Sequence, residues 1–257
     1  MRELVQLHTD YPVATIFLNH PEKHNALSGA LVQALATVLK QIKQDDAIHV
    51  VLLKSSSKHF CAGADIQWMQ ALSEAPLEEN KKDALLLSEL FYELYHLPKP
   101  TIALVHGAAF GGALGIMACC DLVIAHPQAE FGFTEVKIGL TPAVISPYVI
   151  AAMGVRQARR YFLTAEKFST QTALALGLVH VMADSLEAAA APYIERFLQN
   201  SPQAMAVTKE LISLVSFQPM NAKLAEKTAE INARMRKSQD GQEGLKAFLA
   251  KRKPVWQ

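Results

Sequence analysis

The stretch PTIALVHGAAFGGALGIMACC, residues 100–120, carries no formal charge and decides how the fold is read. Its length alone would suit a membrane span. However, glycines at 107, 111, 112 and 115 divide it into a short β-branched run, a turn and a compact helix. We therefore expect a buried strand over Thr101–Val105, then a loop and a buried helix, and no membrane crossing.

Similar apolar runs on either side of this stretch predict further strands, with helical stretches between them. Strands are expected at Val13–Leu18, 50–53, Thr101–Val105 and Leu122–Ala125. A helix is expected over 29–43 with Ser28 as its N-cap, and another over 77–97, ended by Pro98 and Pro100. Strands that alternate with helices predict an α/β core rather than a helical bundle.

After about residue 185 the strand signal stops and only helical patterns follow. These predict helices at Leu186–Leu198, 201–214 and Ala222–Lys237. We therefore divide the chain into a core over residues 1–195 and a helical assembly region over residues 196–257.

Composition excludes several classes of function. The chain has 257 residues, 51% of them hydrophobic, which is enough for one large core. It carries 25 Lys and Arg against 24 Asp and Glu, a formal net charge of +1. A charge near zero gives no indication of a basic surface for nucleic acid or for an anionic membrane, so neither is expected as a partner.

The cysteines and the N-terminus both favour the cytoplasm. Cys61, Cys119 and Cys120 are odd in number and two are adjacent, which suits reduced, buried thiols better than disulfides. Glu3 and Asp10 make a secretory signal unexpected.

Neither a metal site nor a nucleotide-binding loop is expected. His20 and His24 are four residues apart, but Pro21 lies between them and no third ligand is near. The glycines do not form G-x-G-x-x-G, and Asp121 comes too soon to bind a ribose. No Lys followed by Ser or Thr closes the glycine run, which excludes a P-loop.

Two loops carry the chemical signal. FCAGADI, residues 60–66, follows the strand that ends near Lys54 and precedes a helix that Asp65 could cap. GAAFGGALG, residues 107–115, enters a helix whose first N–H groups have no internal partner. One backbone donor from each loop could converge on one oxygen and form an oxyanion hole. Each loop taken alone also fits simple close packing.

These loops and three further segments resemble the enoyl-CoA hydratase/isomerase (crotonase) family. The further segments are NHPEKHNALS at 19–28, FGFTEVKIGLTPAVISPYV at 131–149 and GQEGLKAFLAKRKPVWQ at 241–257, so the resemblance covers essentially the whole chain. Within the family, AAFGGALG, EVKIGLTPAVISP and the C-terminal run most resemble 3-methylglutaconyl-CoA hydratases. The resemblance implies an α/β crotonase-like spiral of ββα units with a C-terminal helical trimerisation region, assembled as a homotrimer or a dimer of trimers.

The resemblance also implies roles for named residues. Glu135 would be the acid/base, and the amides of Ala64 and Gly112 would form the oxyanion hole. The thioester substrate supplies its own CoA, so no separate cofactor is expected. The positions that would contact the CoA substrate, the last two of them from a neighbouring subunit, are Lys23, His24, Ala26, Ala62, Ala64, Asp65, Ile66, Gly112, Phe248 and Lys251.

One position departs from the family pattern. Many hydratases of the family carry a second glutamate early in the helix after the glycine loop, where this chain has Gly115. We expect Gly115 to leave space there and Glu135 to act alone, giving and taking the proton when water adds to a short, branched 2-enoyl-CoA. Glu135 would otherwise be a solvated carboxylate at a helix start.

A single glutamate leaves other functions open. A Δ3,Δ2-enoyl-CoA isomerase would use Glu135 to move a proton from C2 to C4. A non-catalytic acyl-CoA-binding relative or an RNA-binding relative is disfavoured by Glu135 itself and by the neutral charge.

The sequence does not define the acyl group. We expect most of an apolar set to form core rather than to line a pocket: Trp68, Met69, Leu86, Leu87 and Leu90. A distal carboxylate, as in 3-methylglutaconyl-CoA, would need a buried cation or donor. Lys137 is the candidate, with an ordinary surface lysine as the alternative.

Overall fold

The computed structural model describes residues 3–216 and 218–256. Residues 1, 2, 217 and 257, which belong to the predicted core and assembly regions, lie outside the described residues. Six strands form the main sheet in the order β1-β2-β3-β4-β6-β9. β1 runs antiparallel to β2, and the other neighbours are parallel. Their bounds are Val5–Asp10 (β1), Val13–Leu18 (β2), Val50–Ser55 (β3), Thr101–Val105 (β4), Leu122–Ala125 (β6) and Val181–Met182 (β9).

A second sheet has three strands, of which the first lies in the glycine loop and the second ends three residues before Glu135. Its order is β5-β7-β8, with β5 at Ala108–Phe110, β7 at Glu130–Gly132 and β8 at Phe168–Ser169. β5 pairs in parallel with β7, and β7 pairs antiparallel with β8.

The main sheet is covered on both faces, which explains the uninterrupted apolar run of β4. Ala103 and Val105 face a large core shared with helices α1, α3, α4 and α5. Ile102 and Leu104 face the opposite way and pack against α7. The helix bounds are Gly29–Gln44 (α1), Leu77–Tyr95 (α3), Gly112–Cys119 (α4), Ser146–Thr164 (α5) and Leu186–Leu198 (α7).

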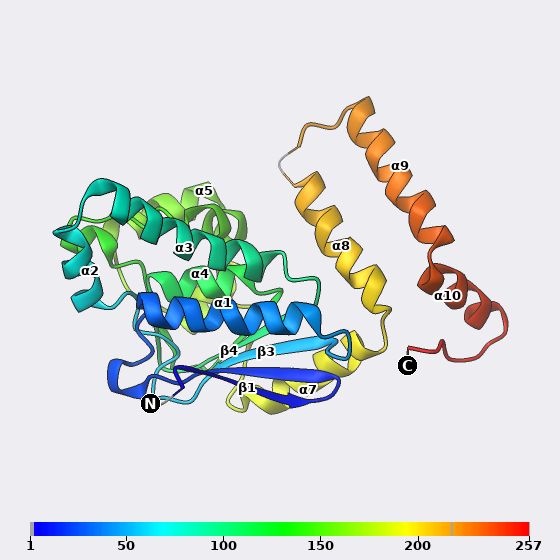
Figure 1. Ribbon diagram of the computed structural model, residues 1–257, viewed down its shortest axis with the longest axis horizontal. Coiled ribbons are helices and arrows are strands. Elements are labelled where there is room, and N and C mark those ends of the chain that lie inside the picture. The colour runs from blue at the N-terminus through cyan, green and yellow to red at the C-terminus, as the bar shows by residue number, and fades with distance from the viewer. Residues whose placement is uncertain (1–2, 217, 257) are drawn as a thin grey trace.

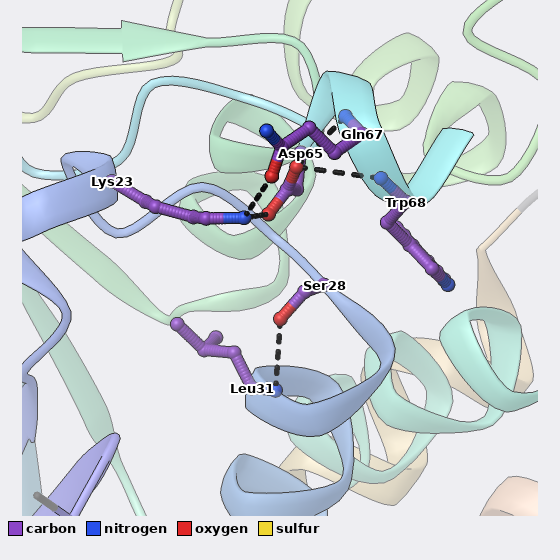
Figure 2. A network of polar contacts seen from close by, with 6 residues as sticks. All are labelled: Lys23, Ser28, Leu31, Asp65, Gln67 and Trp68. Atoms are coloured by element: carbon purple, nitrogen blue, oxygen red, sulfur yellow. Dashed lines mark hydrogen bonds and ion pairs between the residues drawn. The ribbon is translucent and has the colours of Figure 1, made fainter. Parts of the chain in front are cut away.

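Capping side chains begin the helices where the sequence predicts them. Ser28 accepts a hydrogen bond from the amide of Leu31 at the start of α1. Asp65 accepts from the amides of Gln67 and Trp68 and begins α2, Ile66–Ser73. Figure 2 shows both caps. The predicted N-cap of α1 and the proposed cap at Asp65 are therefore confirmed.

The last three helices extend away from the sheet as an arm (Figure 1). They are α8, Pro202–Val215, α9, Ala222–Lys237, and α10, Gln239–Leu249. The predicted boundary after residue 195 falls within α7, whose last turn, with Phe197 and Leu198, still packs on the sheet. The assembly role of the region that follows stays a prediction.

The predicted α/β class is confirmed, and the elements missed from sequence are mostly short. Among them are β1, β5, β7, β8, β9, α5, α6 at Thr170–Ala175, and the 3-10 helices η1 at Pro21–Lys23 and η2 at Glu135–Ile138. Residues 100–120 form the expected strand, loop and buried helix. Within residues 3–216 and 218–256, no helix has the length and apolar character needed to span a membrane.

Candidate active site

The two predicted loops lie side by side and are joined by backbone hydrogen bonds. The amide of Cys61 donates to the carbonyl of Ala108 at 3.2 Å, and the amide of Phe110 donates to the carbonyl of Cys61 at 3.1 Å. Gly63 has φ +98°, and a Cβ there would lie 3.2 Å from the carbonyl oxygen of Phe110. The loops therefore approach closely because glycine permits this conformation and this contact.

Ala64 and Gly112 lie at this junction, and both residues are half-buried. Neither amide donates to an acceptor within the described parts of the chain. Gly112 is the first residue of α4, where backbone N–H groups have no partner inside the helix. An oxyanion hole needs two backbone donors directed at one oxygen, so these two amides remain the candidates that the sequence predicts.

Leu27 contacts both of these positions, a role that the sequence reasoning missed. Its amide donates to the carbonyl of Gly63 at 2.7 Å, and its carbonyl accepts from the amide of Asp65 at 2.8 Å, so its backbone pairs on both sides of Ala64. Its side chain lies where a Cβ on Gly112 would be 2.5 Å from Cδ1. Leu27 lies inside the NHPEKHNALS segment, and that segment was the only signal in the sequence.

Glu135 begins η2 and points its carboxylate at the second loop. A Cβ on Gly111 would lie 3.0 Å from Oε1 of Glu135, which places the carboxylate against the residue before Gly112. Oε2 is buried and, within the described residues, makes no hydrogen bond. Burial raises the pKa of Glu135 above its usual 4.5. The side chain is therefore not the solvated helix-start carboxylate of the alternative interpretation.

The structure contradicts the expected space at Gly115. A Cβ on Gly115 would lie 2.3 Å from Cγ2 of Ile145 and 3.0 Å from Cε1 of Phe91. Ile145 and Phe91 are themselves buried in the core. The place of a second carboxylate is thus filled by apolar side chains, and Glu135 has no carboxylate partner there.

Lys23 is ion-paired across the edge of the first loop. Its ammonium lies 2.5 Å from Oδ2 of Asp65 and 3.0 Å from Oε1 of Gln67 (Figure 2). The hydrogen bond from Lys23, the largest cause, lowers the pKa of Asp65. The side chain of Lys23 is 39% exposed, so the ammonium also faces solvent. A phosphate that bound there would meet a cation already oriented by Asp65.

The other predicted CoA contacts of the core lie around this ion pair. His24 has left-handed backbone at φ 51°, and its carbonyl accepts from the amide of Ala62 at 3.0 Å. Ala26 is buried, whereas Ala62 and Ile66 are exposed. The structure therefore brings the predicted positions between residues 23 and 66 together at the first loop.

Phe248 and Lys251 are not brought to this site within one chain. Phe248 is 81% exposed on α10, and Lys251 is exposed just beyond that helix. Figure 1 shows α10 at the far end of the arm from α2. A contact of these residues with substrate would therefore require a second copy of the chain.

The predicted core role fails for most of the apolar set. Leu90 is buried, and Leu87 packs against the core. Leu86 is 48% exposed, and Trp68 and Met69 are half-buried outside the core, because α2 is a short helix with no buried residue. Lys137 is exposed in η2, as the surface alternative expects.

Comparison with known proteins gives a consistent result. The sequence pattern of the family described as enoyl-CoA hydratase/isomerase matches residues 8–257. A crystal structure of an enoyl-CoA hydratase from Shewanella pealeana has 45% sequence identity and a TM-score of 0.97, over 98% of this chain and 96% of that one.

Two curated relatives carry hydratase names. A protein of Thermus thermophilus with an enoyl-CoA hydratase name is 37% identical over 94% of this chain and 96% of its own length. The short-chain-enoyl-CoA hydratase of Clostridium acetobutylicum is 30% identical over 97% of this chain and 95% of its own length.

Proposed function

The chain belongs to the enoyl-CoA hydratase/isomerase family of enzymes, and we propose that it adds water to the C2=C3 bond of a short 2-enoyl-CoA thioester. One observation carries the proposal. The carboxylate of Glu135, whose Oε2 is buried and makes no hydrogen bond within the described residues, lies against Gly111, the residue before the Gly112 amide.

In the proposed reaction, the thioester oxygen accepts hydrogen bonds from the amides of Ala64 and Gly112. Negative charge grows on this oxygen as the hydroxyl oxygen of water bonds to C3 and the C2=C3 electron pair moves toward the carbonyl. The two fixed donors stabilise that charge, and one such donor is worth about a hundredfold in rate.

Glu135 moves the proton in both halves of the reaction. Its carboxylate takes one proton from water as the C3–O bond forms, and the resulting acid returns that proton to C2 as the enolate collapses. The sum is one molecule of water added, and Glu135 ends ionised as it began. A pKa raised by burial suits a group that must both accept and donate a proton.

The filled space at Gly115 favours a second candidate reaction. Because Ile145 and Phe91 fill the space at Gly115, that position supplies no second proton carrier beside Glu135. An isomerase needs no more than that: Glu135 would take a proton from C2 of a 3-enoyl-CoA and return it at C4 through the same enolate. The isomerase is therefore the alternative to hydration.

The acyl group is proposed to be small, branched and apolar near C3. Val136, Ile138 and Leu140 follow Glu135 and expose apolar surface beside it in the chain. The likeness to 3-methylglutaconyl-CoA hydratases makes that thioester the candidate with a distal carboxylate. Lys137, which is exposed and lies two residues after Glu135, is the candidate cation for this carboxylate.

The arm is proposed to complete the site in an oligomer. Phe248, Leu249 and Val255 are 80–81% exposed, an apolar surface that a second copy would cover. A homotrimer, or a dimer of such trimers, would let Phe248 and Lys251 reach the CoA of a neighbouring subunit.

A panel of thioesters tests the reaction. Crotonyl-CoA, 3-methylcrotonyl-CoA and 3-methylglutaconyl-CoA should each be offered as hydration substrates, with 3-hexenoyl-CoA as the isomerisation substrate. Hydration of a branched thioester faster than of crotonyl-CoA supports the proposal. Rapid formation of 2-hexenoyl-CoA with negligible hydration of the other three assigns the isomerase instead.

A further inference from the structure

His59 lies immediately before the first loop, and its side chain reaches the second. Its Nδ1 accepts a hydrogen bond from the amide of Ala108 at 3.1 Å. Gly107 has φ +63°, and a Cβ there would lie 2.7 Å from that same Nδ1. The second loop therefore turns directly over the imidazole ring.

The main chain of His59 is itself held firmly. Its carbonyl accepts from the Oγ of Ser55 at 2.7 Å and from the Nδ2 of Asn25 at 3.3 Å. Asn25 and Ser55 are buried and bonded to each other at 2.7 Å. The main chain of His59 is thus fixed by hydrogen bonds, so its ring can position the second loop through the contact with Ala108.

Ala108 is the first residue of β5, which leads through Phe110 and Gly111 to the free amide of Gly112. Its amide is held by His59 and its carbonyl by the amide of Cys61. We propose that His59 is a positioning residue that, in its neutral form, anchors β5 and thereby fixes the Gly112 donor of the oxyanion hole. This inference rests on the proposed function of that donor.

The contact allows only one protonation state. A backbone amide can only donate, so Nδ1 must present a lone pair and any ring proton lies on Nε2. A second proton on Nδ1 would point at the amide of Ala108 and break the contact. The anchor therefore exists only while His59 is neutral.

The surroundings of His59 favour the neutral ring. The ring of His24 lies 5.0 Å away in a T-shaped arrangement, and Lys58 and His106 also act on it. Burial, followed by the charges of His24, Lys58 and His106, lowers the pKa of His59 from 6.5. Each of these three partners is cationic when charged and therefore favours the neutral ring. The stability that the contact contributes is present above pH 6.5 and is lost as pH falls through the lowered pKa.

Two substitutions distinguish the role of the hydrogen-bond acceptor at position 59 from that of the imidazole ring. His59→Leu removes the acceptor, and we expect kcat to fall roughly ten- to a hundredfold with KM nearly unchanged, because the oxyanion donor is misplaced. His59→Asn places Oδ1 near the position of Nδ1 and cannot ionise, so kcat at pH 8 should remain within about threefold of wild type.

The chain offers a matched control. Nδ1 of His180 accepts from the amide of Val123 at 3.0 Å, and burial likewise lowers its pKa, but this contact lies on β6 of the main sheet. His180→Leu should lower the melting temperature about as much as His59→Leu does and leave kcat near wild type. Equal losses of kcat in the two leucine variants would overturn the proposal.

The pH profile supplies a readout that a merely structural residue would not move. In the wild type, protonation of both Glu135 and His59 lowers kcat, so log kcat should fall with a slope approaching two in acid. In His59→Asn the slope should return to one. An identical acid slope in both proteins contradicts the proposal, even if His59→Leu does not fold.

Failure of the proposed reaction can be distinguished from failure of the His59 proposal. If the wild type turns over none of the thioesters, the reaction is wrong, while ¹⁵N NMR of the His59 ring still decides the contact. A neutral ring protonated on Nε2 at pH 7 supports it. A ring protonated on Nδ1 at pH 7 overturns it.

Discussion

Glu135 joins the chemistry of the site to the stability of the fold at the scale of one residue. Its Oε2 is buried without a hydrogen-bond partner inside residues 3–216 and 218–256, which costs folding free energy. A catalytic base needs such an oxygen, because the proton that it must accept comes from substrate or water. The site is therefore expected to be less stable than an uncharged version of itself.

Glu135→Gln tests whether the carboxylate is needed for turnover and whether it also lowers the stability of the fold. The substitution removes the proton carrier, so turnover should fall by about two to four orders of magnitude. Since burial raises the folded pKa of Glu135, its contribution to stability is present below pH 4.5 and is lost as pH rises through the folded pKa. At pH 8 the glutamine variant should therefore be more stable than wild type, by about 1 kcal/mol.

Urea unfolding at pH 8 and at pH 4, together with CoA-binding calorimetry, measures these effects. The stability difference should shrink at pH 4, and CoA should bind the variant as it binds wild type. A variant that retains turnover removes Glu135 from the mechanism, and one that is less stable at pH 8 contradicts the argument from burial.

At the scale of elements, the two loops form one unit because Leu27 pairs around Ala64 and packs on Gly112. The first turn of α4 then presents its amide where β5 ends. The proposed donors are main-chain groups, so removing a side chain tests them poorly.

Gly112→Pro deletes the amide at the first position of α4, a helix position that proline tolerates. We expect the rate to fall about a hundredfold or more, the usual effect of losing one oxyanion donor. Gly112→Ala is the matched control, since both variants bring a Cβ toward the flexible end of Leu27 but only alanine keeps the N–H. Steady-state kinetics on folded proteins should separate the two; equal rates would exclude a donor role for this amide.

At the scale of the whole molecule, the arm of α8, α9 and α10 separates the predicted CoA contacts into two groups (Figure 1). Lys23 and its neighbours lie at the loops, whereas Phe248 and Lys251 lie at the far end of the arm. Only assembly would reunite the two groups.

Lys251→Ala should therefore raise KM for CoA thioesters several-fold while leaving kcat nearly unchanged, the pattern of lost uniform binding. Exposed Lys237 on α9 provides a control of equal charge, and Lys237→Ala should leave KM as in wild type. Light scattering should show a trimer or hexamer for all three proteins. An unchanged KM in Lys251→Ala would show that Lys251 is an ordinary surface lysine that does not contact CoA.

Local sequence was sufficient for much of the fold. The bounds of β2, β4, β6, α7 and α9 agree with the predicted ranges, because short apolar runs and helical spacing are patterns between near neighbours in the chain. The crotonase-like fold expected from the motifs is confirmed by the structural likeness to the Shewanella pealeana hydratase. The short strands β5, β8 and β9 were missed because two or three residues carry too little pattern.

The sequence by itself identified the candidate groups for the chemistry: two small-residue loops, one glutamate after FGFT, and a glycine where many relatives carry a second acid. Only the tertiary structure decided what surrounds them. Ile145 fills the space at Gly115 from thirty residues away, and His59 holds Ala108 from the preceding loop. Spacing along a chain encodes which groups are neighbours within an element, whereas the filling of a volume depends on how distant elements pack.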